Sequence, residues 1–245
     1  MTSAARSLWF VGPRAVAVTS VEIPPLTDGR VLVRTTFSGI SSGTELLAYR
    51  GELDPELPVD ETIGALGGTF RFPFRYGYSC VGVVEESRSA LEPGTLIFAF
   101  HPHQDRFVVD ADSVLPLGSV CPREATLFPL VETALQISLD AGPVLDDTVV
   151  VFGLGVVGML TALMIRRAGG RVVAVEPRSW RRDAAAGLDI VAVAPEALQD
   201  TLHSTGRSPL VPLVIEASGN PQVLRSALPL LAHEGTALVA SWYGT

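Results

Sequence analysis

The sequence predicts an α/β protein in which a β-rich amino-terminal half precedes a doubly wound parallel sheet. Two observations carry this prediction. Up to about residue 120, short apolar or alternating runs are separated by glycine- and proline-rich turns, which is typical of antiparallel β structure. From Asp146 onward, strand-like and helix-like segments alternate, which is typical of a parallel sheet with helices on both faces.

The amino-terminal half is expected to contain little helix. Its expected strands are Ala15–Ile23, Arg30–Phe37, Tyr78–Glu85, Leu96–Phe100 and Phe107–Val109. A single helical turn is expected over Leu46–Tyr49. Between this turn and the third strand, Glu52–Phe74 holds three prolines and a cluster of glycines, which predicts a long surface loop.

The composition changes at Pro122, and we expect three regions: a β-rich domain over 1–121, a bridging helix within 122–145 and a parallel-sheet domain over 146–245. Apolar residues at helical spacing predict the bridging helix over Arg123–Leu139. The third region is expected to alternate the strands Val149–Phe152, Arg171–Val175, Asp189–Val193, Leu213–Ala217 and Thr236–Ser241 with the helices Met159–Arg167, Pro195–Leu202 and Pro221–Leu231.

The first strand of the third region runs directly into a G-x-G-x-x-G motif, whose glycines are Gly153, Gly155 and Gly158. The first glycine permits a tight turn, the second lets the backbone approach a pyrophosphate, and the third lets helix and strand pack closely. The following strand ends at Glu176, where a carboxylate can accept both ribose hydroxyls. Strand, glycine turn, helix, strand and acid in this order predict a Rossmann dinucleotide-binding fold, with Val157 of the motif also at the cofactor. Glycines that merely pack a βα corner are the alternative.

Composition excludes several classes of protein. With 47% hydrophobic and 18% charged residues, the chain can bury a large core. A formal net charge of −8 argues against nucleic acid or an anionic membrane surface as partner. The uncharged run Val149–Ile165 carries three glycines and fits a strand–helix unit better than a membrane span. Two cysteines without a C-x-x-C, and a start without signal-peptide layout, predict a reduced cytoplasmic protein.

Three segments resemble the medium-chain dehydrogenase/reductase family of the zinc alcohol dehydrogenase type. Ser38–Glu45 resembles the family's C-G-T-D segment, Tyr76–Val84 its G-H-E-x-x-G-x-V segment, and Ile215–Gly219 its fourth Rossmann strand. The first two are most similar to the branch of bacteriochlorophyllide dehydrogenases and zinc-dehydrogenase-like proteins. The resemblance implies a GroES-like catalytic domain before the Rossmann domain. It also implies an NAD(P)-dependent oxidoreductase that interconverts an alcohol and a carbonyl, or reduces an activated double bond, of a small metabolite.

The resemblance further places Thr133, Arg181, Ala217 and Ser218 at the cofactor. NAD is the expected cofactor, because Glu176 would repel a 2′-phosphate at close range. NADP is the alternative, because the guanidinium groups of Arg181 and its neighbours at positions 178 and 182 would favour that phosphate.

The sequence departs from the family at the positions that bind its catalytic zinc. The family's zinc-binding cysteine falls on Ser42 and its zinc-binding histidine on Tyr78, while the third ligand falls on Pro129 or, in another alignment, on Glu132. A catalytic zinc requires three protein ligands from cysteine, histidine or carboxylate. We therefore expect no catalytic zinc, so no residue is assigned to a metal.

Without zinc, another group must polarise a carbonyl or move a proton. Thr44 falls on the family's proton-relay hydroxyl, Tyr78 could donate its phenolic proton, and His103 could supply or drain it. A non-catalytic explanation is also open for each residue. Thr44 caps a helical turn, Tyr78 faces solvent from a strand, and His103, together with His101, is a surface imidazole. These two histidines, with Glu45 and Glu132, are also the side chains that keep a rearranged zinc site open.

Two other function classes remain open: a cyclase or lyase on the same scaffold, and a non-catalytic dinucleotide-binding protein. In the family, the chain continues beyond the equivalent of Ser241 with a last Rossmann strand. The expected strand Thr236–Ser241 would then have an open apolar edge, which favours a homodimer or a cover supplied by Met1–Ser7. A proline at Leu238 is expected to remove a donor from such an interface.

Overall fold

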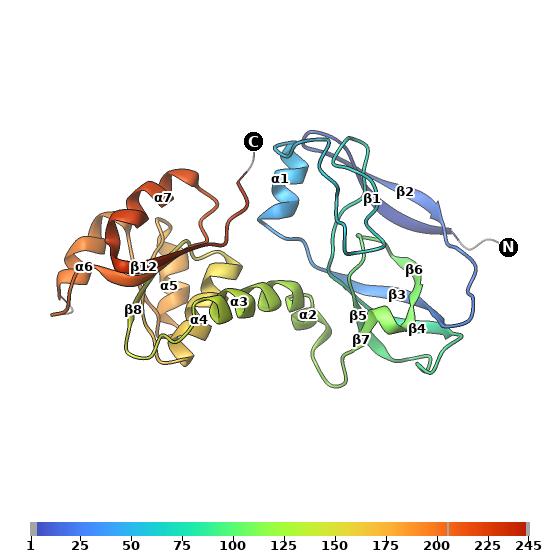
Figure 1. Cartoon of the computed structure of the whole chain (residues 1–245). Helices are drawn as coiled ribbons and strands as arrows, with labels where there is room; N and C mark the ends of the chain where they lie inside the picture. Colours follow the sequence, from blue (N-terminus) through green and yellow to red (C-terminus); the bar gives the residue numbers. More distant parts are fainter. Residues whose placement is uncertain (1–3, 205, 244–245) are drawn as a thin grey trace. The chain divides into compact units, whose positions relative to one another are not determined.

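The computed structural model describes residues 4–204 and 206–243, which form two compact units (Figure 1). Unit 1 comprises the chain up to Pro129, and unit 2 runs from Leu130 to Tyr243. The boundary lies inside the segment 122–145, which we expected to bridge two domains. Each unit has its own sheet and its own hydrophobic core.

Unit 1 is built on a five-stranded antiparallel sheet of order β6-β3-β4-β5-β7, which confirms the expected β-rich domain. Val31, Val33 and Phe107 are among the side chains that fill its core. The elements are β3 (Arg30–Ser38), α1 (Thr44–Arg50), β4 (Cys80–Ser87), β5 (Leu96–Ala99), β6 (Arg106–Asp110), η1 (Ala111–Ser113), β7 (Val114–Pro116) and α2 (Pro122–Ala125).

A separate hairpin of β1 (Ala4–Gly12) and β2 (Ala15–Glu22) precedes this sheet. The sequence did not predict β1, because two of its inward-facing residues are the small Ala5 and Ser7, so the apolar alternation is weak. Ala4–Ser7 pairs with β2 throughout. The expectation that Met1–Ser7 covers the last strand is therefore wrong for these four residues, and Met1–Ser3 lies outside the described residues.

The long segment between α1 and β4 is irregular, as expected, but it is not a mere surface loop. Its aromatic residues form a second core in unit 1, in which Phe10 of β1 stacks on Phe74 at 5.1 Å between ring centroids. Phe70 and Tyr76 meet edge to face at 5.3 Å. Glycines and prolines obscured this core, because its apolar residues follow no regular period.

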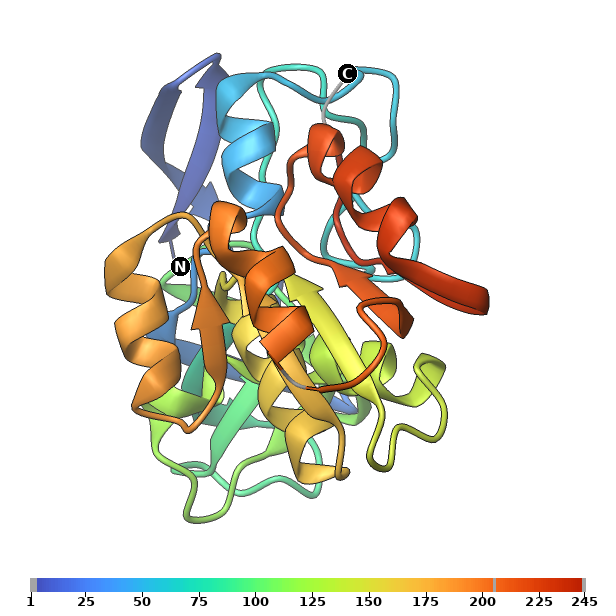
Figure 2. The ribbon, with the colours of Figure 1, turned by 90° about the vertical axis from the view of Figure 1, so that its left-hand side faces the viewer.

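Unit 2 contains a five-stranded parallel sheet of order β10-β9-β8-β11-β12, with helices on both faces (Figures 1 and 2). This confirms the predicted doubly wound fold. The elements are α3 (Phe128–Asp140, which begins in unit 1), β8 (Thr148–Phe152), α4 (Val156–Arg167), β9 (Arg171–Val175), α5 (Ser179–Ala186), β10 (Val191–Val193), η2 (Pro195–Ala197), α6 (Leu198–Ser204), β11 (Val211–Glu216), α7 (Pro221–Ala227), η3 (Leu228–Leu230) and β12 (Leu231–Val239).

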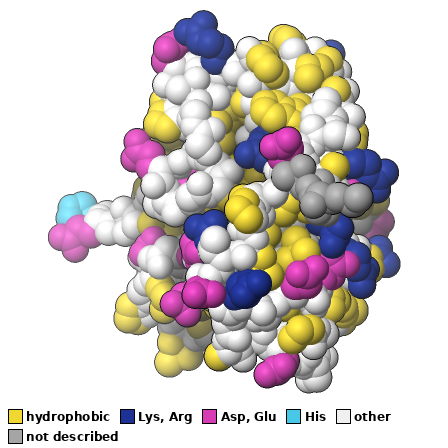
Figure 3. Space-filling view, turned by 90° about the vertical axis from the view of Figure 1, so that its right-hand side faces the viewer, with side chains coloured by type: hydrophobic (Ala, Val, Ile, Leu, Met, Phe, Trp, Pro, Cys, Tyr) yellow, Lys and Arg dark blue, Asp and Glu magenta, His cyan; other side chains and the backbone are white. Residues whose placement is uncertain are grey.

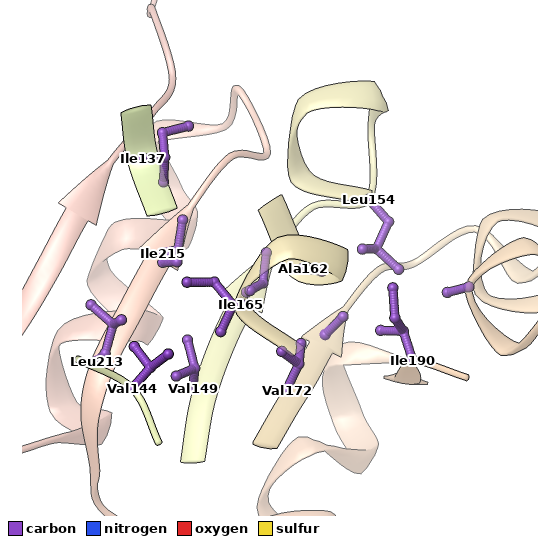
Figure 4. Close-up of a cluster of buried hydrophobic side chains, with 13 residues drawn as sticks. Ile137, Val144, Val149, Leu154, Ala162, Ile165, Val172, Ile190, Leu213 and Ile215 are labelled. Atoms are coloured by element: carbon purple, nitrogen blue, oxygen red, sulfur yellow. The ribbon is translucent and has the colours of Figure 1, made fainter. Parts of the chain in front are cut away.

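The central strand β8 is buried on both faces, as expected for a parallel strand. Val149 and Val151 pack with Ile165 of α4 on one face, in the cluster drawn in Figure 4. Val150 and Phe152 pack on the other face, with residues of α6 and α7. This double burial fixes the carboxyl end of β8, where the glycine motif begins.

Several predicted elements differ from the observed ones; the helix expected over Pro221–Leu231, for example, ends at Ala227 and is followed by η3. The expected bridging helix is split into α2 and α3, and α4 starts at Val156 rather than Met159. Helix α5 was not predicted, because Ala185 is its only fully buried residue and it therefore lacks an apolar stripe. Strand β12 begins five residues before the predicted Thr236, and its pairing with β11 skips the residues between Leu231 and Thr236.

Among the described residues, no helix has both the length and the apolar character needed to cross a membrane.

On the face drawn in Figure 3, basic side chains lie next to acidic ones. Several surface arginines of unit 1 are paired in this way, for example Arg6 with Asp105 at 2.8 Å.

Candidate functional site

The glycine motif of unit 2 has the geometry that each of its three positions requires. Gly153 has φ +89°, and a Cβ there would lie 2.5 Å from Ser218 Cα. A Cβ on Gly158 would lie 2.0 Å from Gly153 O, so only glycine permits this approach of α4 to the turn. A Cβ on Gly155 would meet no atom within 4 Å. The backbone at Gly155 therefore faces open space at the amino end of α4, where a pyrophosphate can approach.

Glu176 lies directly after β9 and its carboxylate is turned toward the glycine turn. Oε2 accepts the N–H of Leu154 at 3.0 Å, and Oε1 accepts the N–H of Arg178 at 3.0 Å. Burial alone would raise the pKa of this carboxyl, but these two N–H groups and Arg181 outweigh it and hold the pKa below its ordinary value. Glu176 is therefore an anion fixed beside the turn, and a carboxylate has further lone pairs for two ribose hydroxyls.

The arginines after Glu176 are not equivalent. Arg181 Nη1 donates to Glu176 Oε2 at 3.3 Å, and its guanidinium lies 5.0 Å from the ring centroid of Trp180. Arg182 donates to the main-chain oxygens of Glu176 and Pro177 at 2.8 Å. Both arginines therefore have hydrogen-bond partners beside the Glu176 carboxylate.

Ala217 and Ser218 follow β11 and lie against the glycine turn. The N–H of Ala217 donates to Phe152 O at 2.8 Å, and Ser218 is the residue that a side chain on Gly153 would strike. The structure thus brings Ala217 and Ser218 to the same end of the sheet as Glu176. Thr133, also assigned to the cofactor, is half-buried on α3, and Val157 is half-buried in the first turn of α4.

Glu216 is a buried residue of this region whose role was not predicted. It is fully buried at the end of β11, and its Oε1 accepts the Ser218 N–H at 2.7 Å. Its Oε2 accepts the hydroxyl of Tyr243 at 2.5 Å, and burial together with this carboxylate raises the pKa of Tyr243 to about 12. The buried Glu216 carboxylate thus helps to hold the turn at Ala217–Ser218 in place.

In unit 1, His103 and Glu45 form a buried pair. His103 Nε2 lies 2.7 Å from Glu45 Oε2, and both side chains are less than a tenth exposed. Glu45 Oε1 accepts the N–H of Ser41 at 2.9 Å, which ties the turn before α1 to the same carboxylate. On its other side, His103 Nδ1 lies 2.6 Å from Ser38 Oγ, at the end of β3.

Tyr78 and Thr44, two of the catalytic candidates from the sequence, lie close together in this unit. Tyr78 lies in the segment before β4 rather than on a strand, and it is half-buried against Tyr76, so its solvent-facing alternative is wrong. Burial raises the pKa of Tyr78, and the nearby side chains of Ser41 and Thr44 lower this pKa in part. The cap of α1 is Gly43, so Thr44 is the first helical residue rather than its cap.

His101 and His103 are both buried, so their interpretation as surface imidazoles is wrong. His101 stacks on Phe107 at 3.8 Å between ring centroids, and burial lowers its pKa to about 4. Its ring is therefore neutral and belongs to the core. Cys80, next to Ser38 at 3.3 Å, is also buried, and burial raises its pKa to about 11.

The residues at the family's zinc positions do not suit the metal. Ser42 is an exposed hydroxyl, Tyr78 carries a phenol that keeps its proton, and Glu132 is exposed on α3. Among residues 4–204 and 206–243, no three His, Cys, Asp or Glu side chains form a group that could hold a metal ion. Hydroxyl and phenol groups are poor substitutes for the thiolate and imidazole that Zn²⁺ prefers.

Sequence inspection missed the partners of His103. Ser38 and Glu45 are 65 and 58 residues away from it along the chain. Their only sequence signal was that both lie in the segment similar to C-G-T-D, at either end of it. Residues this distant reveal a contact only when the fold brings β3, α1 and the segment before β6 together.

No protein-family model matches the chain. Over 95% of its length, the chain is 27% identical to the 2-desacetyl-2-hydroxyethyl bacteriochlorophyllide A dehydrogenase of Cereibacter sphaeroides, of which it covers 72%. This similarity spans both units, including the segments that carry Glu45, Tyr78 and the glycine motif.

Two solved structures share the fold of both units. A protein described as a zinc-binding dehydrogenase from Sinorhizobium meliloti 1021, bound to NADP, aligns with a TM-score of 0.78 at 20% identity, over 99% of this chain and 78% of that one. An alcohol dehydrogenase of E. coli CFT073, complexed with NADH, aligns with a TM-score of 0.76 at 17% identity, over 97% and 76%.

Proposed function

This chain belongs to the medium-chain dehydrogenase/reductase superfamily, and on that premise we propose that it interconverts an alcohol and a carbonyl group of a small metabolite, with NAD as cofactor and without catalytic zinc. The observation that carries the proposal is the anionic Glu176, fixed by the Leu154 N–H beside an open Gly155. The relatives' complexes with NADP and NADH support a nicotinamide dinucleotide in general.

Unit 2 would hold the cofactor through its own backbone and one carboxylate. The open backbone at Gly155 and the free N–H groups at the start of α4 would receive the pyrophosphate. Glu176 would accept the two ribose hydroxyls, and Arg181 would contact the adenosine ribose. The cofactor, when bound, supplies or accepts a hydride.

Unit 1 would supply the proton. In the direction of reduction, Tyr78 O–H donates its proton to the carbonyl oxygen as a hydride reaches the carbonyl carbon, and the resulting phenolate recovers a proton from solvent. A raised pKa suits this task, because the phenol stays protonated until negative charge develops on the substrate. The Thr44 hydroxyl, which lies close to Tyr78, would orient the phenol. His103 lies behind Glu45 and would act through it.

The proposal includes a homodimer, supported by the open edge of β12. Within the described residues, β12 pairs with β11 and with no second strand. An unpaired apolar edge favours addition of another strand.

The test is a titration of NADH fluorescence together with the absorbance of reduced nicotinamide during incubation with a panel of alcohols and carbonyl compounds. We expect NADH binding and turnover. Tyr78→Phe should lower turnover by about 100-fold or more while leaving NADH binding unchanged. Tyr49→Phe, which removes another half-buried phenol of unit 1, is the matched control. Binding without turnover on any compound would reject the redox function but keep the dinucleotide site.

A further inference from the structure

Unit 1 contains a partly open cavity of about 440 Å³, and none of the catalytic candidates lines it. Its wall combines the rings of Trp9, Phe72 and Phe74 with two guanidinium groups, those of Arg71 and Arg75. A volume of this size lies within the range of sites that bind small organic molecules. The charge and the hydrogen bonds of the wall indicate which class of molecule fits.

Arg75 is half-buried in this wall and has no carboxylate partner among the described residues. The other half-buried arginines in the described part of unit 1 each have one. Arg30 pairs with Asp110 at 2.8 Å, Arg50 with Glu52 at 2.7 Å and Arg106 with Glu85 at 2.6 Å. A guanidinium that is partly withdrawn from water without a counter-charge is unfavourable. The cavity wall therefore carries a positive charge that no neighbouring side chain neutralises.

The Arg75 guanidinium is held from one side only. Its Nη1 donates to Gln104 Oε1 at 3.2 Å, and among residues 4–204 and 206–243 this is the only hydrogen bond of its side chain. The buried Gln104 is itself fixed, because its Nε2 donates to Arg106 O at 2.7 Å. A guanidinium has five N–H groups, so the remaining ones are available to an acceptor.

Trp9 adds a second donor that lacks an acceptor. Its ring lies against the guanidinium, with 5.6 Å between the ring centroid and Arg75 Cζ. Its Nε1 atom is buried and has no hydrogen-bond partner in the part of the chain that the structure describes. A buried donor without a partner costs about 1–3 kcal/mol. Two neighbouring groups of one cavity wall thus lack acceptor atoms, which the oxygens of an anionic ligand would supply.

The net charge of the wall favours a ligand with a single negative charge. Arg71 forms an ion pair with Glu56, so Arg75 alone contributes an uncompensated charge. A carboxylate carries one negative charge, whereas a phosphate monoester carries nearly two at neutral pH. The planar fork of a guanidinium also matches the two oxygens of a carboxylate. The rings of Trp9 and the half-buried Phe72 offer an apolar surface for the body of the ligand.

We propose that this cavity binds a small organic monocarboxylate with a flat ring, the carboxylate against Arg75 and the ring against Trp9 and Phe72. The inference goes beyond the proposed function, since no residue of the cavity wall has a part in hydride or proton transfer. It assigns unit 1 a ligand site that does not require the dinucleotide.

Sodium benzoate is the probe, and the indole N–H signal of Trp9 is the reporter. The chain has three tryptophans, so this signal can be assigned by its loss in Trp9→Phe. We expect benzoate to shift it saturably, with a dissociation constant of about 1 mM or lower. Benzamide has the same ring without the charge and should bind about tenfold more weakly, because charge-assisted hydrogen bonds are the stronger ones. Phenyl phosphate should also bind more weakly than benzoate.

A pair of variants locates the charge that the ligand requires. Arg75→Gln should weaken benzoate binding by about tenfold or more, because hydrogen bonds to a charged group are worth about 1.5–3 kcal/mol. Arg88→Gln, which removes an exposed arginine of the same unit, is the matched control and should bind benzoate as the wild type does.

The proposal would be overturned by the absence of a saturable Trp9 shift with benzoate, or by an unchanged affinity in Arg75→Gln. Equal or tighter binding of benzamide or phenyl phosphate would reject the single-charge assignment and the proposal with it. The same shift with sodium chloride would show a general salt effect and have the same consequence. If Arg75→Gln fails to fold, the three probes on the wild type decide alone. None of these measurements uses NADH, so they are unaffected if the proposed function fails.

Discussion

The Glu176 carboxylate accepts the backbone N–H of Leu154 at 3.0 Å, so the acid after β9 and the glycine turn after β8 are one connected structure. Removing the carboxylate should therefore affect both the ribose and the turn. We expect Glu176→Ala to weaken NADH binding by about tenfold and to reduce the preference for NADH over NADPH.

The measurement is a pair of titrations with NADH and NADPH. Glu196→Ala, an exposed carboxylate of unit 2, is the control and should bind both as the wild type does. NADPH binding as tight as NADH binding in the wild type would contradict the role of Glu176.

Replacing two glycines of the motif by alanine should affect the stability of the protein and its binding of the dinucleotide to different degrees. Gly158→Ala should lower the free energy of unfolding by about 3 kcal/mol, because its Cβ would overlap Gly153 O. Gly155→Ala should change it by less than about 0.5 kcal/mol, because Gly155 has φ −65° and open space around it. Its methyl group should nevertheless weaken dinucleotide binding. Denaturant unfolding and NADH titration of both variants provide the test, and equal stability losses would refute this assignment.

Purified protein should carry much less than one zinc per chain, because Ser42 and Tyr78 stand at the thiolate and imidazole positions. Turnover should persist after dialysis against a chelator. Elemental analysis decides. Stoichiometric zinc that is lost on mutation of Glu132 or His103 would indicate a rearranged metal site instead.

His101 should make the stability of unit 1 depend on pH. Its pKa is lowered from 6.5 to about 4 by burial, so the unfolded chain binds a proton that the folded chain excludes. Its contribution is fully present above pH 6.5 and is lost progressively as the pH falls toward 4, by a total of about 3 kcal/mol. His101→Gln should flatten this part of the curve. Unfolding measured between pH 4 and 7 in both proteins checks it, and parallel curves would show that His101 is not responsible.

In a dimer through β12, only the N–H groups on the outer edge of the strand could bond to the partner. A proline that tests the dimer must therefore replace one of these outward donors. Ala240 N–H donates to Glu216 O of β11, so by two-residue alternation the N–H of Leu238 also faces β11. The expectation that a proline at Leu238 removes a donor from the dimer interface is therefore wrong, because this proline would remove a hydrogen bond between β12 and β11. Val239→Pro removes an outward donor and should convert a dimer to a monomer. Light scattering after size exclusion tests this, and a wild type that is monomeric at high concentration would remove the proposed dimer.

Local features of the sequence predicted most of unit 2. The order of β8, the glycine turn, α4, β9 and Glu176 lies within 30 consecutive residues, and the pattern is short-range. Helix α5 and strand β1 were missed because their buried side chains are small or few. The contacts around His103 were beyond prediction, because they join residues far apart in the chain.

The attachment of β1 to the His103 segment bears on how the protein is made. Leu8 N–H donates to His103 O at 3.0 Å, and the Ser7 hydroxyl, 96 residues away from it in sequence, bonds to the same oxygen at 3.3 Å. At roughly 5–20 residues per second of synthesis, β1 waits on the order of 5–20 s for this partner to be made. Until Phe74 is made, the nascent strand also exposes Phe10 without its stacking partner. Slower translation would prolong the exposure, and the growing chain would then depend more heavily on chaperones.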